Sequence, residues 1–186
     1  LWVRVAKYGV LEQNVFVFNL GLMRVPKGIA ERKVNLSGCV LAVDVGIRTG
    51  FAVYDETGTL VQYGSHNYGS VSRLKQAAWG HLSEIRNLHF LVLEGGGALA
   101  EVWQHTAQKR GIRVIQLYAE TWRKDLLYQR EQRTGKIAKS FAEEAARKVI
   151  RESNLPAPKS LRHDAAEAIL AGRWAIFFSD LQKQEE

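Results

Sequence analysis

Two short apolar runs, each bearing a single carboxylate at or near its end, constrain most strongly what this chain can fold into. Residues 40–45 are apolar except for Asp44, and residues 90–93 are apolar and are followed by Glu94. Runs of this length without polar alternation are typical of strands that are buried on both faces. A carboxylate in such a strand is costly unless a metal, a cation or hydrogen bonds compensate it. The sequence therefore predicts a covered sheet with acidic groups placed inside it.

The rest of the chain supplies three more strands and the helices to cover them. Further strands are expected over 51–54, 59–63 and 114–117, and helices over 71–86, 99–110, 136–153 and from about 161 onward. A three-stranded meander followed by alternating helices and strands predicts an α/β fold with a mixed five-stranded sheet, flanked by helices. We expect residues 37–178 to form this domain. Residues 1–36 are an N-terminal extension of uncertain structure, and residues 179–186 are a polar tail.

Four acidic residues stand where they could meet. Asp44 and Glu94 belong to the two apolar strands, and Asp164 and Glu167 lie three residues apart on one face of the last helix. Clustered carboxylates repel one another unless a cation is present, and their oxygens suit Mg²⁺ or Mn²⁺. Two such ions about 4 Å apart can activate water and stabilise the leaving oxygen in phosphodiester cleavage. Each acid alone also has a structural explanation, as a turn cap, an ion-pair partner or a helix-dipole partner.

Several segments resemble RuvC-type Holliday junction resolvases of the ribonuclease-H-like superfamily. Residues 40–46 with 49–53 resemble the family's first hairpin, and residues 91–94 resemble its second acidic strand. Residues 163–171 resemble its C-terminal motif of two acids on a helix, and residues 120–124 are similar to a Thr-Trp-Arg/Lys segment of RuvC-like proteins. The resemblance covers about residues 39–176.

This resemblance implies a ribonuclease-H-like fold, a Mg²⁺-dependent endonuclease and a homodimer that cuts branched DNA such as a four-way junction. Asp44, Glu94, Asp164 and Glu167 would be the catalytic residues and metal ligands. The chain departs from the pattern in having Glu167 where many relatives have Asp. It also has three glycines, at 95–97, where many resolvases carry aromatic residues.

A basic stretch precedes and enters the expected long helix, in a chain of net charge +7. This charge is typical of proteins that meet phosphate backbones. The residues expected to bind nucleic acid are Arg123, Lys124, Arg130, Arg133, Lys136 and Lys139. Of these, Lys136 and Lys139 are the candidates for reaching the metals, and the sequence leaves open which one does. His163 is a candidate for proton transfer or for holding a ligand in place, or has no catalytic role.

Other readings stay open. A YqgF-like nuclease would process structured RNA with the same chemistry, and a catalytically inactive module would only bind nucleic acid. An actin-like ATPase is disfavoured, because only the first phosphate loop finds a counterpart, in residues 44–50. Cys39 is the single cysteine, so an intramolecular disulfide is excluded. We expect Cys39 to pack in the core. We expect a cytoplasmic protein without a membrane span, and a homodimer in which Trp103 anchors the interface.

Overall fold

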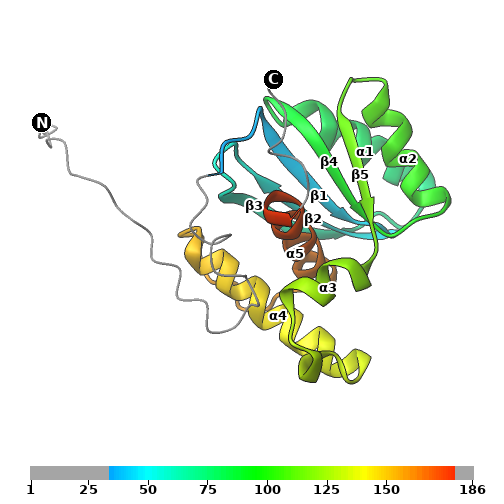
Figure 1. Ribbon diagram of the computed structural model, residues 1–186. Helices are drawn as coiled ribbons and strands as arrows, with labels where there is room; N and C mark the ends of the chain where they lie inside the picture. Colours follow the sequence, from blue (N-terminus) through cyan, green and yellow to red (C-terminus); the bar gives the residue numbers. More distant parts are fainter. Residues whose placement is uncertain (1–33, 179–186) are drawn as a thin grey trace, which may run out of the picture.

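The computed structural model describes residues 34–178 and shows a five-stranded mixed sheet (Figure 1). The strands are β1 (Cys39–Asp44), β2 (Arg48–Tyr54), β3 (Leu60–Asn67), β4 (Leu88–Glu94) and β5 (Arg113–Leu117). They lie in the order β3-β2-β1-β4-β5. The meander β1–β2–β3 is antiparallel, and β4 and β5 extend the sheet in parallel with β1. The predicted α/β fold is confirmed, and this arrangement is consistent with a ribonuclease-H-like fold.

Helices cover both faces of the sheet, as the apolar strands require. The helices of the described residues are α1 (Val71–Glu84), α2 (Ala98–Gln108), α3 (Ala119–Leu126), α4 (Gly135–Glu152) and α5 (His163–Phe178), with a 3₁₀ turn η1 (Gln129–Gln132) between α3 and α4. One face, with Leu41 and Val43, packs against α1 and α2. The other face, with Val40 and Ala42, packs against α3, α4 and α5 (Figure 1).

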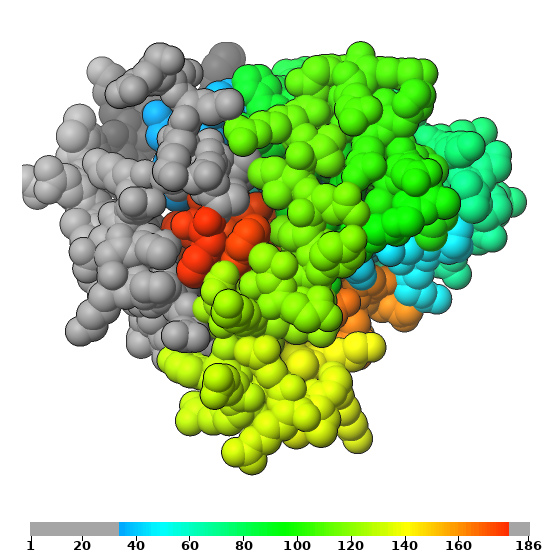
Figure 2. All heavy atoms as spheres, turned by 45° about the vertical axis from the view of Figure 1, so that its right-hand side comes forward, coloured from blue at the N-terminus to red at the C-terminus, as the bar shows by residue number. Residues whose placement is uncertain are grey.

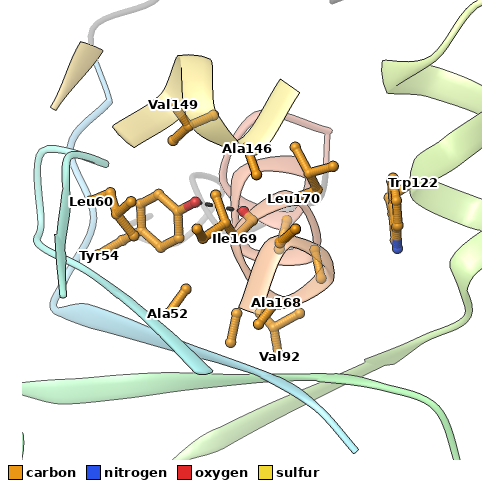
Figure 3. Close-up of a cluster of buried hydrophobic side chains, with 14 of the residues drawn as sticks. Ala52, Tyr54, Leu60, Val92, Trp122, Ala146, Val149, Ala168, Ile169 and Leu170 are labelled. Carbon is orange, nitrogen blue, oxygen red and sulfur yellow. Dashed lines mark hydrogen bonds between the residues drawn. The ribbon is translucent and has the colours of Figure 1, made fainter. Parts of the chain in front are cut away.

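Helix α5 packs so closely against the sheet that no side chain fits between them at two positions, and both positions are glycines. A Cβ on Gly50 of β2 would lie 1.9 Å from the Asp164 carbonyl oxygen, and a Cβ on Gly172 would lie 2.5 Å from the Tyr54 ring. The Tyr54 hydroxyl donates a buried hydrogen bond of 2.5 Å to the Ile169 carbonyl (Figure 3). This close contact places the start of α5, with its two acids, beside the ends of the central strands.

The sequence did not predict α3, and it placed some strand ends too narrowly. The sequence of residues 119–126 does not indicate a helix, because an eight-residue helix offers too few apolar positions to show a helical period. Its buried side rests on Trp122 and Leu126, and no side chain caps its first turn. Strand β2 begins at Arg48 rather than at residue 51, and β3 runs on to Asn67. Trp122 is buried in the core, and its side chain faces α5 (Figure 3).

The suggestion that Trp103 anchors a dimer interface is wrong. Its side chain is fully buried between α2 and the sheet, in the cluster that contains Leu91 and Leu93. The predicted extension falls almost wholly outside the described residues, although Leu36 is buried and its amide donates to the Glu56 carbonyl at 2.9 Å. The predicted tail, 179–186, also lies outside them. Among the described helices, none has the length and apolar character needed to cross a bilayer.

Candidate metal centre

Two of the four predicted acids are neighbours at the end of the sheet. Asp44 ends β1 and Glu94 ends β4, and these residues are partners in the parallel register of the two strands. Successive side chains of a strand point to opposite faces, so both carboxylates share the face of Ala42 and Val92, which α5 covers. The sequence signal for this arrangement is that each of the two apolar runs carries an acidic residue at or near its end.

Helix α5 adds a third carboxylate. One oxygen from each of Asp44, Glu94 and Glu167 lies within 4.8 Å of the others, and we call these three residues the acid cluster. Asp164 is not part of it: its Oδ2 accepts a hydrogen bond of 2.6 Å from the Ser65 hydroxyl. Asp164 nevertheless lines the same open depression, of about 530 Å³, as Asp44 and Glu167. Three predicted ligands therefore meet, and the fourth lies at the edge.

The acid cluster is electrostatically strained. Burial, followed by the negative charges of Glu167 and Asp164, raises the pKa of Asp44 to about 7. Burial, followed by the charges of Glu167 and Asp44, raises the pKa of Glu94 to about 8. Both pKa values mean that the fully ionised cluster is unfavourable at neutral pH without an added cation.

Arg123 already supplies one positive charge. Its Nη2 lies 2.5 Å from Glu167 Oε1, and its guanidinium sits 5.1 Å from the centre of the Trp122 ring. Its charge lowers the pKa of both Asp44 and Glu94. Arg123 was predicted to bind nucleic acid, and its contact with Glu167 was not predicted because helix α3 itself was not. The available sequence signal for this contact was that the chain carries both a Trp122–Arg123 pair and the two-acid helix motif of Asp164 and Glu167.

The remaining basic residues differ in their distance from the acid cluster. Lys139 on α4 is close enough for its charge to lower the pKa of Asp44, whereas no such influence of Lys136 on the cluster is found. Both are exposed, as are Lys124, Arg130 and Arg133. The segment 119–139, which we call the basic lobe, protrudes at the lower edge of the space-filling view (Figure 2). His163 is exposed and lines the depression beside Asp164.

The acid cluster fits a hard divalent cation. Its donors are carboxylate oxygens only, which is the ligand type that Mg²⁺ and Mn²⁺ prefer. Glu94 is 5% exposed, and its buried Oε2 has no hydrogen-bond partner among the described residues. The Trp122 indole N–H favours the charged form of Glu94, although it does not reach good hydrogen-bond geometry. A buried carboxylate oxygen left without a partner is what a bound cation would satisfy.

Comparisons with known proteins add no family assignment. No protein-family profile matches the chain, and no curated protein sequence matches it. Among solved structures, a chain of the simian T-cell lymphotropic virus intasome in complex with PP2A regulatory subunit B56 gamma aligns at 10% identity and a TM-score of 0.35. The aligned part covers 80% of this chain and 56% of that chain. A likeness this weak supports no argument about function.

The raised pKa values predict an unusual pH dependence of stability. Both carboxyls have unfolded-state pKa values near 4, so the folded chain holds protons that the unfolded chain releases between about pH 4 and pH 8. The free energy of unfolding contributed by these groups therefore falls as pH rises through that window. Mg²⁺ binds the deprotonated acids, so it should stabilise the protein most near pH 8.

Thermal unfolding of the wild type and of Asp44→Asn, with EDTA or Mg²⁺, measures this effect. The wild-type melting temperature in EDTA should fall relative to that of Asp44→Asn as pH rises from about 5 to 8. Mg²⁺ should restore it in the wild type only. Parallel pH profiles for the two proteins would show that Asp44 is not destabilised by burial and by its acidic neighbours.

Proposed function

We propose that this protein is a Mg²⁺-dependent, structure-specific endodeoxyribonuclease that cleaves Holliday junctions or related branched DNA by two-metal phosphodiester hydrolysis. One observation carries the proposal: three carboxylates from β1, β4 and α5 converge within 4.8 Å, on a sheet of ribonuclease-H-like order. Asp44, Glu94 and Glu167 would hold the metals, with Asp164 as a further ligand. Divalent ions bound there would supply an activated water and stabilise the leaving oxygen.

The chain's own residues would prepare the acid cluster for this reaction. Arg123 holds Glu167 in place and offsets part of the negative charge. Of the two candidate lysines, Lys139 is the one that would neutralise a phosphate near Asp44, because its charge already acts on that carboxylate. His163, at the rim of the depression, is placed to exchange protons with solvent.

Two alternatives keep the fold and change the function. A YqgF-like nuclease would use the same carboxylates on structured RNA. The acid cluster alone favours neither branched DNA nor RNA as the substrate. A catalytically inactive nucleic-acid-binding module would need no buried acid without a partner, so the Glu94 oxygen argues against it. Branched DNA is preferred because of the segment around Trp122 and the Asp164–Glu167 motif, which resemble those of resolvases.

A cleavage assay on a substrate panel tests the proposal. Four-way junction, flap, duplex and structured RNA are incubated with the protein and Mg²⁺, Mn²⁺ or EDTA. We expect cutting of branched DNA that depends on the divalent ion. Preferential cutting of the RNA would favour the YqgF-like alternative. Binding to any of these substrates, without cutting under any metal, would favour the inactive module.

Two arginines of the basic lobe should govern binding rather than chemistry. Arg130 and Arg133 are exposed on it, and the Arg130 guanidinium lies 5.2 Å from the centre of the Tyr128 ring. Replacing both arginines with Gln should weaken junction binding and lower the slope of log affinity against log salt by about two, one for each lost phosphate contact. Titrations at four salt concentrations measure this slope. An unchanged slope would mean that these arginines face solvent in the complex.

We expect the protein to act as a two-fold homodimer, because a four-way junction presents two equivalent strands. The surface between α1 and α2 suits such an interface. Trp79 is 63% exposed there, beside Lys75 of α1 and Glu101 of α2. A two-fold axis that passes between Lys75 and Glu101 would bring Lys75 of one copy towards Glu101 of the other. Trp79→Ser should convert the dimer to monomer in sedimentation, and a wild type that is monomeric at micromolar concentration, with and without junction, would exclude the interface.

A further inference from the structure

A second group of basic side chains lies beside the acid cluster, apart from the basic lobe. Arg48, Arg162 and His163 line the same depression of about 530 Å³ as Asp44, Asp164 and Glu167. All three are exposed, while the acids form its inner part. Sequence patterns did not single out either arginine, because one begins a strand and the other precedes a helix, far apart in the chain.

The sheet order places these arginines on the opposite side of Asp44 from the basic lobe. Arg48 begins β2, which pairs with β1 on one side, whereas β4, β5 and then α3 follow on the other side. Arg162 immediately precedes α5, whose start lies against Gly50 of β2. In Figure 2 the orange segment that leads into α5 lies between the yellow-green to yellow basic lobe and the cyan strand residues. The acids therefore lie between two cationic surfaces.

The arginines of the two surfaces differ in whether they form ion pairs within the protein. Arg123, on the lobe side, is half-buried and paired with Glu167. Within residues 34–178, no ion pair involves Arg48 or Arg162. An exposed guanidinium next to carboxylates, but not paired with them, is available for an anion from outside. Its planar set of donors matches the oxygens of a phosphate.

We propose that Arg48 and Arg162 bind backbone phosphates of the substrate strand on the β2 side of the acid cluster. The strand then runs from the basic lobe, across Asp44 and Glu167, to the start of β2 and α5. This inference rests on the proposed function, and it adds the direction of the strand and the residues that hold its far side. Cations on both sides of the acids hold the phosphate between them against the repulsion of the carboxylates.

Phosphate-ethylation interference on a four-way DNA junction tests this path, with Ca²⁺ in place of Mg²⁺. The full-length wild type is compared with the double variant Arg48→Gln/Arg162→Gln. We expect the double variant to bind about tenfold more weakly and its salt slope to fall by about two. Interference should disappear at one or two phosphates on one side of the cutting position only. The Arg130→Gln/Arg133→Gln protein should lose interference on the other side.

Arg86→Gln/Arg110→Gln is the matched control, because both arginines are exposed and lie at the ends of α1 and α2, on the other face of the sheet. It should behave as wild type. If the Arg48/Arg162 variant keeps wild-type affinity and pattern, or loses interference evenly on both sides, the proposed path is wrong. A wild type that binds neither junction nor RNA would instead overturn the proposed function, and the path with it.

Discussion

Asp44→Asn should abolish cleavage while leaving the protein folded. Asparagine keeps the size of the side chain but removes a charge that the divalent ions need, so the cleavage rate should fall by about three orders of magnitude or more. The metal-free protein should be at least as stable as wild type near pH 8, because the cost of burying the Asp44 charge and its repulsion by Glu167 are both relieved. Junction binding should persist, since one negative charge facing the phosphates is gone.

Cleavage rates under single-turnover conditions, with circular dichroism melts, measure both parts of this prediction. Glu84→Gln is the control, because Glu84 is exposed at the end of α1, on the other face of the sheet. It should cut as wild type does. A folded Asp44→Asn protein that cuts at the wild-type rate would remove Asp44 from the reaction.

Gly50→Ala should destabilise the protein strongly and abolish cleavage. The added Cβ would lie 1.9 Å from the Asp164 carbonyl oxygen, and backbone atoms rather than a flexible side chain stand in its way. Helix α5 must therefore move away from β2, at a cost of about 3 kcal/mol or more in the free energy of unfolding. The same movement would draw Glu167 away from Asp44 and Glu94, so cleavage should be lost as well.

Urea unfolding measures the stability change, and Gly135→Ala provides the matched control. Nothing lies within 4 Å of a Cβ at Gly135, which begins α4. Alanine favours helix more than glycine does, so this variant should be as stable as wild type or more stable by up to about 1 kcal/mol. Equal stability of the two variants would contradict the close contact between β2 and α5.

The fold was largely predictable because the strongest sequence signals are local. Apolar runs at 40–45 and 90–93 predicted buried strands, and apolar residues at helical spacing predicted the helices α1 and α2. Helix α3 escaped prediction because its stability comes from burying Trp122 and Leu126 against the core. Tertiary packing of that kind leaves no periodic pattern in eight residues.

The acidic residues of the candidate site could be predicted from the sequence, but the side chains that contact them could not. The sequence predicted four acids at one end of the sheet, because strand ends and helix spacing restrict where they can lie. It could not predict that Ser65 would hold Asp164, or that Arg123 would pair with Glu167. Ser65 and Arg123 come from β3 and α3, and only the folded chain brings them to α5.

Anomalous diffraction from crystals soaked in Mn²⁺ tests the central claim most directly, since it locates the ion without relying on activity. We predict a manganese peak among the carboxylates of Asp44, Glu94 and Glu167, within about 2.0 to 2.3 Å of their oxygens. The same soak of Asp44→Asn crystals should show a much weaker peak or none. Manganese bound only elsewhere, or its absence from the acid cluster at millimolar concentration, would contradict the metal centre and the nuclease activity proposed from it.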